Sequence, residues 1–263
     1  MKLSSSTLER IERGHRFSPF YEDDLSNHLP MALAALDGLG AGAAEIAAFA
    51  DHYERILEAL PAPVGDISER TVSDFLSRQP AVSSWIVFFD GRIASLGAKE
   101  TTRLWLDKLM PGIGSVAFHG LLRLAYAVES GGNEELAHAL AQWAAGYTTL
   151  GALPTFASPG TTPEAALALL DGTKGRYPGG NIVERMQKVK EDPYFTAAVA
   201  GGGMKELTTA ALAKAALSAY RATGNFTVLH AVTACHAFRL LAPHMRDSDE
   251  GRLYLWQALV CAL

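Results

Sequence analysis

Three histidines occur in stretches that otherwise have the pattern of apolar helices. They are His28 in NHLPMALAAL, His119 in VAFHGLLRLAYAVE and His230 in FTVLHAVTACHAF. An imidazole on a buried helix face costs free energy unless another group pairs with it. Because the three histidines lie in distant parts of the chain, we predict that separate helices direct their imidazoles toward a common point. Such a point is a candidate site for iron, zinc, copper or nickel, all of which bind imidazole.

A structural role is the alternative for these histidines. His28 shares a helix face with Met31, and His119 shares one with Tyr126. A core histidine that is hydrogen-bonded to a backbone carbonyl would explain either position equally well. The surroundings of the two residues therefore leave a ligand role and a core role both open.

The helix that carries His230 is apolar on all sides, which is typical of a central, buried helix. Thr233, one turn further on, is placed to hydrogen-bond an imidazole or a substrate. His236 is in the same helix, but at 100° per residue its ring points about 120° away from that of His230. His236 is therefore a fourth ligand only if a π-bulge turns it, and otherwise it has a supporting or structural role. We expect Thr233 and Tyr126 to act on the substrate.

The other histidines have weaker patterns. His15 and His244 neighbour charged residues, so we expect both to be solvated, and His52 is expected on a helix surface. Glu135 and His138 have the Glu-x-x-His spacing of di-iron bundles, but such bundles need a second copy. No second copy occurs in the sequence, so we interpret this spacing as a chance match.

Glycine clusters at 38–42 (GLGAG) and 200–204 (AGGGM) follow no predicted strand, so they are not dinucleotide-binding fingerprints. AGGGM is expected to begin a helix, where exposed N–H groups are able to hold a phosphate, although a plain helix start is the simpler interpretation. Nucleophile elbows and Walker motifs do not occur in the sequence.

The chain has 263 residues, of which 49% are hydrophobic, and a net charge of −5. This length allows a sizeable core, and the absence of a basic stretch argues against nucleic acid as a partner. Cys235 and Cys261 have no metal or disulfide spacing, so we expect reduced core residues in a cytoplasmic protein. We find no signal peptide and no apolar run that is long enough to span a membrane.

Helical periodicity dominates the chain, and alternating β-branched runs do not occur. The residues between 150 and 181 are expected to be irregular apart from one short helix, and such a stretch usually covers a site or moves. The pattern predicts an all-α fold of one domain over 1–263, with helices at 24–39, 43–60, 69–77, 81–96, 99–109, 115–130, 134–149, 163–171, 181–191, 204–222, 226–242 and 252–262. The last helix is apolar to the end at Leu263, which is a hint of a homodimer.

Three stretches together resemble the questin oxidase-like family. They are NHLPMALAALDGLGA (27–41), AFHGLLRLAYAVESG (117–131) and FTVLHAVTACHAFRLL (226–241). They occur in the order of the family and at similar spacing, so the resemblance covers most of the chain. It implies an all-helical fold around a central pocket and oxidative ring opening of polycyclic aromatic substrates such as anthraquinones, with a link to NADPH.

The resemblance also implies that at least some members hold a mononuclear non-haem iron through histidines and a carboxylated lysine. By resemblance, His28, His119 and His230 are ligands of this iron and His236 is the candidate fourth. The lysine of the family belongs to a segment beyond Leu263, so no residue of this sequence is assigned to it. A relative that binds no metal therefore remains an alternative.

Our main hypothesis is a metal-dependent oxidoreductase acting on a small aromatic or quinone-like molecule. Tyr126, Trp143 and Trp256 are candidate walls of its pocket, with core packing as the alternative for each. A second hypothesis is a binding protein, in which the same pocket holds a hydrophobic ligand without metal. The third is a helical interaction domain whose histidines are satisfied core residues. Bound metal, a bound organic molecule or neither would distinguish the three.

Overall fold

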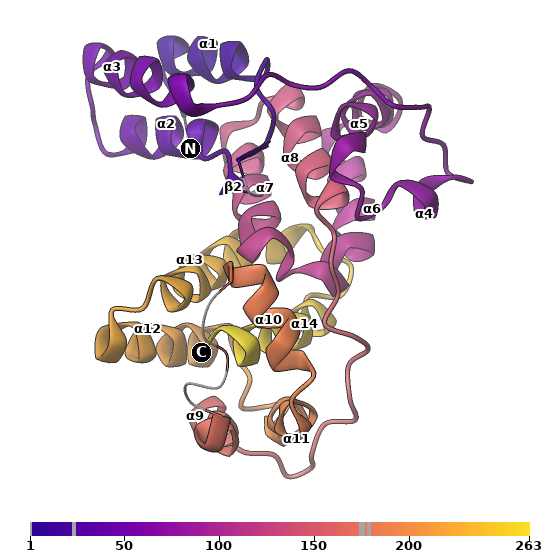
Figure 1. Cartoon of the computed structure of the whole chain (residues 1–263), viewed down its shortest axis with the longest axis vertical. Helices are drawn as coiled ribbons and strands as arrows, with labels where there is room; N and C mark the ends of the chain where they lie inside the picture. Colours follow the sequence, from indigo (N-terminus) through magenta and orange to yellow (C-terminus); the bar gives the residue numbers. More distant parts are fainter. Residues whose placement is uncertain (1, 23–24, 174–176, 178–179) are drawn as a thin grey trace. The chain divides into compact units, whose positions relative to one another are not determined.

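The structure is a computed structural model that describes residues 2–22, 25–173, 177 and 180–263. Within these residues the fold is all-α, as the sequence predicts (Figure 1). The two short strands β1 (Phe20–Tyr21) and β2 (Leu25–Ser26) pair antiparallel, with Phe20 opposite Ser26. No described helix combines the length and the apolar character that a bilayer-spanning segment needs.

The described residues fall into two compact units. The first consists of residues up to 105 together with 119–147, and the second consists of 106–118 together with 148–263. Whether both units fold as the one domain over 1–263 stays a prediction.

The α-helices that begin in the first unit are α1 (Ser5–Gly14), α2 (Leu29–Gly38), α3 (Ala43–Tyr53), α4 (Val72–Phe75), α5 (Val82–Leu96), α6 (Ala98–Leu109), α7 (His119–Ser130) and α8 (Asn133–Ala145). Those of the second unit are α9 (Pro163–Leu167), α10 (Ile182–Lys190), α11 (Pro193–Gly201), α12 (Thr209–Thr223), α13 (Phe226–Leu241) and α14 (Ser248–Ala262). Short 3₁₀ turns are η1 (Glu54–Ile56), η2 (Gln79–Ala81), η3 (Met110–Gly112), η4 (Ser115–Phe118), η5 (Ala168–Thr173) and η6 (Ala242–His244).

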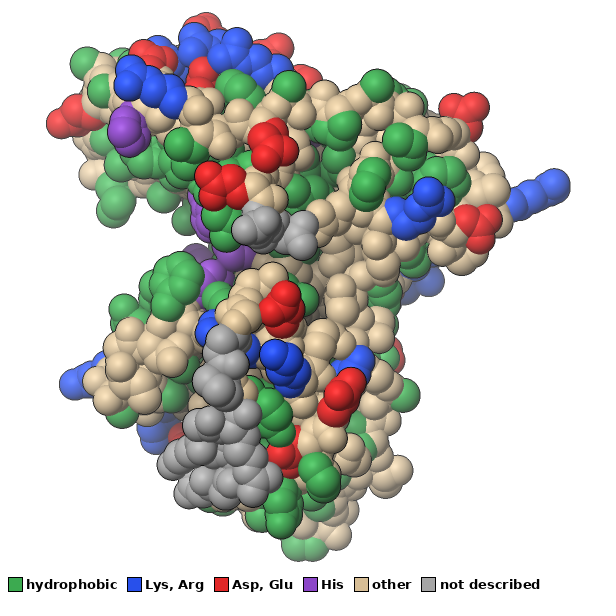
Figure 2. All heavy atoms as spheres, in the orientation of Figure 1, with side chains coloured by type: hydrophobic (Ala, Val, Ile, Leu, Met, Phe, Trp, Pro, Cys, Tyr) green, Lys and Arg blue, Asp and Glu red, His purple; other side chains and the backbone are tan. Residues whose placement is uncertain are grey.

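Helices α1, α2 and α3 pack on one another at the start of the first unit (Figure 1). Ile11, Leu33 and Ile46, one from each helix, are buried in their shared core. Charged side chains gather on the outside of α1 and α3 (Figure 2). Among them, Arg13 of α1 forms ion pairs with both Asp51 and Glu54. The three helices thus follow the amphipathic pattern of surface helices, with one apolar face turned inward.

The rest of the first unit is built on α8, which packs along α5 and beside α7. Three fully buried aromatic rings, Trp85, Phe89 and Trp105, fill the space next to α5. The Trp105 ring meets Trp85 and Phe89 edge to face, with centroids 5.6 and 4.8 Å away. Such edge-to-face contacts add stabilisation beyond the buried area, so these rings stabilise the packing of α6 against α5.

In the second unit α12 packs against α13, and α14 contacts α10, α11 and α13. Trp256 of α14 is fully buried and donates its indole N–H to the Val199 carbonyl at 2.9 Å. Cys235 and Cys261 are both free and buried, as predicted. Burial raises the pKa of both thiols, that of Cys235 to about 12, so neither is a reactive thiolate at neutral pH.

Several helix boundaries differ from the prediction because contacts distant in sequence override local propensity. The predicted helix at 43–60 ends at Tyr53, and after η1 the chain becomes extended. The backbone N–H of Ser18 donates to the Glu58 carbonyl and that of Leu60 donates to the Arg16 carbonyl, both at 2.8 Å. These bonds tie the segment to the chain after α1 and prevent it from remaining helical.

The predicted helix at 24–39 begins only at Leu29, because Leu25 and Ser26 pair with β1. Pro30 lies in its first turn, as predicted. The helix predicted at 69–77 shrinks to α4, and the one predicted at 134–149 ends at Ala145. α1 is not among the predicted helices.

The helix predicted at 204–222 begins at Thr209, and α11 precedes it unpredicted. Asp192 caps α11 by accepting the Tyr194 N–H at 2.8 Å, and Pro193 follows it. An aspartate followed by proline is a regular start signal that was available in the sequence. Part of the stretch at 150–181 that we expect to be irregular lies outside the described residues.

The AGGGM segment ends α11 and does not begin a helix, so that expectation is wrong. A side chain at Gly202 would meet the Trp256 indole nitrogen at 2.8 Å, and one at Gly160 would meet the Gly203 Cα at 2.1 Å. The glycines are therefore required by close backbone packing, which explains them without a phosphate.

Candidate functional site

His28 and His119 form a close pair in the first unit. Their Nε2 atoms lie 2.7 Å apart, and the rings are perpendicular, with an interplanar angle of 89° and centroids 4.5 Å apart. Two of the three histidines that the sequence singles out are thus brought together from distant helices. Their role as metal ligands stays a prediction.

His28 is positioned by the turn between β2 and α2. Asn27 accepts the Leu29 N–H at 2.9 Å and donates its amide to the Ser18 carbonyl at 3.0 Å, which fixes the start of the helix. His28 is the N-cap residue and is exposed, so the prediction of a buried helix-face position is wrong. The helix starts later than predicted, and this moves His28 from its face to its end.

Tyr53 of α3 lies against His28 from the other side. Its hydroxyl accepts the His28 backbone N–H at 3.3 Å and lies 3.4 Å from Nδ1 of the ring. Burial and a hydrogen bond with Tyr21 raise the pKa of Tyr53, so its hydroxyl stays protonated. The oxygen of a neutral hydroxyl is able to accept a proton from Nδ1, and this tautomer leaves the Nε2 lone pair directed at His119.

His119 follows directly on a strained turn. Val116, Ala117 and Phe118 have φ values of +50°, +52° and +67°, whereas a right-handed helix was predicted over 115–130. Left-handed backbone costs non-glycine residues about 1–2 kcal/mol each, and such strain is concentrated at functional sites. The turn delivers His119 as the first residue of α7, with 6% of its surface exposed.

The His28–His119 pair fits a transition metal ion. Imidazole nitrogens bind iron-group or zinc ions at about 2.0–2.1 Å, so two ligands at right angles are about 2.9 Å apart. The observed 2.7 Å separation needs only a small opening to reach this value. Without an ion, one Nε2 must carry a proton and donate it to the other.

His230 is in α13, in the second unit, and is buried. Its Nδ1 is hydrogen-bonded to the Phe226 carbonyl at 2.8 Å, and burial lowers its pKa despite this bond. A carbonyl oxygen is only a hydrogen-bond acceptor, so Nδ1 must be the nitrogen that carries the proton of the neutral ring. This tautomer places the lone pair on Nε2, which is the usual arrangement of a ligating histidine.

The helix α13 is regular, without the π-bulge that would turn His236. His236 is exposed, and its Nδ1 lies 3.4 Å from the Arg239 guanidinium. Thr233 is also exposed, and its hydroxyl lies 3.1 Å from the His230 carbonyl, to which it donates. Both residues keep their proposed roles as predictions.

The three aromatic residues proposed as pocket walls have different surroundings. Trp143 and Trp256 have no exposed surface, so they are core residues. Tyr126 is half-buried and packs against the core of α1, α2 and α3. Only Tyr126 therefore keeps the surface that contact with a substrate requires.

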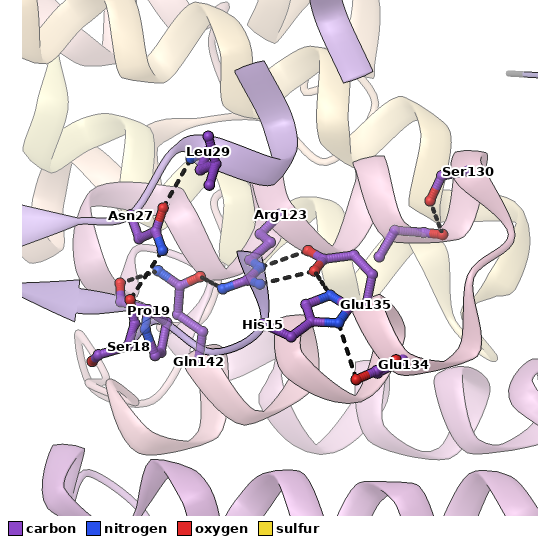
Figure 3. Close-up of polar contacts among 11 residues, drawn as sticks. His15, Ser18, Pro19, Asn27, Leu29, Arg123, Ser130, Glu134, Glu135 and Gln142 are labelled. Carbon is purple, nitrogen blue, oxygen red and sulfur yellow. Dashed lines mark hydrogen bonds and ion pairs between the residues drawn. The ribbon is translucent and has the colours of Figure 1, made fainter. Parts of the chain in front are cut away.

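A buried ionic network in the first unit was missed by the sequence analysis (Figure 3). Arg123 donates two hydrogen bonds to the Glu135 carboxylate, one from Nε at 2.6 Å and one from Nη2 at 2.9 Å. The Nε2 atom of His15 lies 2.8 Å from the same carboxylate. His15 is 8% exposed, so its predicted solvation is wrong. An arginine on an apolar helix was the available signal, since it must find a carboxylate when buried.

The Glu135-x-x-His138 spacing does not form half of a di-iron site, because Glu135 is occupied by Arg123 and His15. Burial raises the pKa of Glu135, but Arg123 and His15 outweigh it and lower the pKa to about 2. The carboxylate is therefore charged and fully paired. This agrees with the interpretation of the spacing as a chance match to di-iron bundles.

The second unit contains a cavity of about 600 Å³ between α9, α10, α12, α13 and α14. Its described lining is mostly apolar and includes Ala215, Val228 and Val260, with Arg185 as a charged member. Pockets of this size and character bind drug-sized organic molecules. The cavity therefore has the volume for a small organic molecule.

The fold and the paired imidazoles define an all-helical protein with a histidine-based candidate metal site. The family model described as Questin oxidase-like matches residues 25–206. Because this is more than half of the sequence, the chain belongs to the questin oxidase-like family. Membership indicates an oxidoreductase that acts on aromatic compounds. The matched range includes His28 and His119 but ends before His230. No curated protein matches the chain.

Proposed function

We propose that the protein is a non-haem-iron oxidoreductase that opens a ring of a small aromatic or quinone-like molecule by oxidation. The observation that carries the proposal is the His28–His119 pair, whose Nε2 atoms lie 2.7 Å apart. Neutral imidazoles suit iron, and family membership supports an aromatic substrate. The cytoplasm is the proposed location, in keeping with two free, buried cysteines.

His28 and His119 are the proposed first two ligands, and His230 is the third. The role of His230 rests on the family resemblance and on the tautomer that the Phe226 carbonyl selects. His236 stays a candidate fourth ligand, although its exposure and its contact with Arg239 favour it less. NADPH as the electron donor and a homodimer are further parts of the proposal that rest on the sequence.

The residues of the chain have separate tasks in this scheme. Tyr53 holds the His28 ring from the Nδ1 side, and Asn27 fixes the helix start that carries it. Tyr126 is proposed to contact the aromatic ring of the substrate, and Thr233 to hydrogen-bond one of its oxygens. Ferrous iron, held by these histidines, would supply the activation of dioxygen that oxidative ring cleavage requires.

A second candidate function is a metal-free binding protein for a hydrophobic molecule. The apolar cavity of the second unit favours it, because binding there needs no contribution from His28 or His119. A hydrophobic ligand that co-purifies with the protein and is lost on Val228→Trp, without any change in metal content, would support this function.

The test of the main proposal is the iron content of protein reconstituted anaerobically with ferrous iron. We expect His28→Ala and His119→Ala each to lose about one equivalent of iron and the oxygen consumption that depends on an anthraquinone. His52→Ala is the matched control, because His52 is an exposed histidine of α3 in the same unit. Equal iron content in the native chain and the three variants would refute the ligand assignment. The cavity of the second unit would then become the better candidate site.

A further inference from the structure

A second group of metal-ligating side chains lies where the end of α1 meets α8. His15 is the C-cap residue of α1, and Glu134 and His138 are one turn apart on α8. One ligand atom of each of these three residues lies within 4.8 Å of the others. His15 and His138 are 8% and 4% exposed, so two imidazoles are withdrawn from water at this point.

The His15 ring is oriented as a ligating histidine would be. Its Nε2 lies 2.8 Å from Glu135, and this carboxylate is held in place by Arg123 (Figure 3). A histidine that binds a metal through one nitrogen usually donates its other N–H to a carboxylate, which fixes the ring and the tautomer. Donation from Nε2 to Glu135 leaves Nδ1 of His15 as the ligand atom.

The Nδ1 atom of His15 faces a second carboxylate. It lies 3.1 Å from Oε1 of Glu134, yet this buried nitrogen has no hydrogen-bond partner in the described residues. Two ligands on one tetrahedral ion, each about 2.0–2.1 Å from it, are about 3.3 Å apart. The distance between His15 Nδ1 and Glu134 Oε1 is close to this ligand-to-ligand distance, and the two atoms are not oriented as a hydrogen bond requires.

His138 supplies the observation that points most directly to a ligand. Its ring stacks on His15, with centroids 4.2 Å apart, and its Nδ1 is buried without a hydrogen-bond partner among the described residues. An imidazole with an unsatisfied buried nitrogen is costly alone and is a good ligand for a transition metal.

The charges around the cluster favour a cation. Arg123 is paired with Glu135, while Glu134 has no cation among its described contacts other than His15. A divalent ion would supply the Glu134 carboxylate with the counter-charge that its described contacts lack.

We propose that His15, Glu134 and His138 form a site for a divalent transition metal ion, such as zinc, that ties α1 to α8. The site is separate from the proposed iron ligands and does not depend on the proposed function. Two imidazoles and one carboxylate are a ligand set that zinc accepts, and a water molecule fills the fourth position in such sites. Glu134 has 54% of its side chain exposed, so this position has access to solvent.

The test uses the full chain in a His28→Ala/His119→Ala background, which removes the proposed iron ligands. Zinc binding is measured by calorimetry, and cobalt is used as a coloured probe of the ligand set. We expect about one zinc per chain, cobalt absorption bands in the visible range, and a higher temperature of unfolding in the presence of zinc.

Two substitutions in this background decide the assignment. His138→Gln removes a buried nitrogen ligand, and Glu134→Gln removes the charge of an exposed one, so the second keeps the fold even if the first does not. We expect Glu134→Gln to weaken zinc binding by about tenfold or more. The control is Glu9→Gln, the same change at an exposed residue of α1, which is expected to leave binding unchanged.

The proposal is overturned if the background protein binds no zinc. It is also overturned if Glu134→Gln and Glu9→Gln bind zinc equally well. Neither result bears on the iron proposal, because every protein in the zinc experiment lacks the two proposed iron ligands His28 and His119. Conversely, a native chain that binds no iron would leave the zinc experiment unaffected.

Discussion

The Nε2 atoms of His28 and His119 meet at 2.7 Å although 91 positions separate the two residues in the sequence. One ring is carried by the N-cap of α2, and the other by the first residue of α7. Both side chains therefore project from helix starts, where the preceding turn and not the helix face sets their direction.

Removing the Tyr53 hydroxyl should weaken metal binding at the His28–His119 pair. The hydroxyl contacts both the ring and the backbone of His28, and such supporting contacts typically contribute 10- to 100-fold in metal affinity. We expect Tyr53→Phe to lower iron affinity by about tenfold in a competition titration with a chelator. Tyr220→Phe, at a half-buried tyrosine of α12, should leave the affinity unchanged; equal affinities of both variants would contradict the role of Tyr53.

Gly120 should not tolerate a side chain. A Cβ there would lie 2.6 Å from Cγ of Trp143 and 3.0 Å from its backbone Cα, so the neighbour has no room to move. We expect Gly120→Ala to lower the free energy of unfolding by about 1–3 kcal/mol. Gly91→Ala is the control, because its Cβ would meet nothing within 4 Å in the middle of α5. The control should raise stability by about 0.5–1 kcal/mol, and denaturant titration measures both changes.

The left-handed turn before His119 predicts that glycine is better than alanine at position 117. Ala117 has φ +52° and ψ +49°, a conformation that costs alanine about 1–2 kcal/mol and glycine little. We expect Ala117→Gly to raise the free energy of unfolding by about 1 kcal/mol. A decrease like that of an ordinary helical Ala→Gly substitution would show that the turn is right-handed.

Breaking the buried Arg123–Glu135 pair should be far more harmful than breaking a surface pair. Arg123→Met leaves the Glu135 carboxylate buried without its main partner, which typically costs about 3–5 kcal/mol. Thermal and denaturant unfolding should show this loss, and Glu135→Leu in the same chain should recover part of it. Arg252→Met, which breaks an ion pair with the exposed Asp249, should change stability little. Equal losses from both single variants would contradict the importance of burial.

Much of the fold follows from local pattern. The period of apolar residues predicts the all-α class and places α5, α6, α10 and α13 within one residue of their observed ends. Pro30 marks the start of α2, and the apolar surroundings of Cys235 and Cys261 predict their burial. These features depend on neighbours within one or two helical turns, which the sequence displays directly.

Helix ends that depend on distant partners could not be read in this way. The chain after Tyr53 leaves the helix because residues near 16–18 pair with it. Three successive residues before His119 are left-handed although none is glycine. Local propensity favours a right-handed helix at both places, and tertiary contacts override it.

The sequence by itself determined that His28, His119 and His230 required an explanation, since each interrupts an apolar run. Only the tertiary structure decided that His28 is exposed at a helix end and meets His119 there. It also decided that His15 is buried, because its partner Glu135 is 120 positions away. Burial and pairing of a polar side chain depend on groups that folding brings near in space, and sequence neighbours do not reveal them.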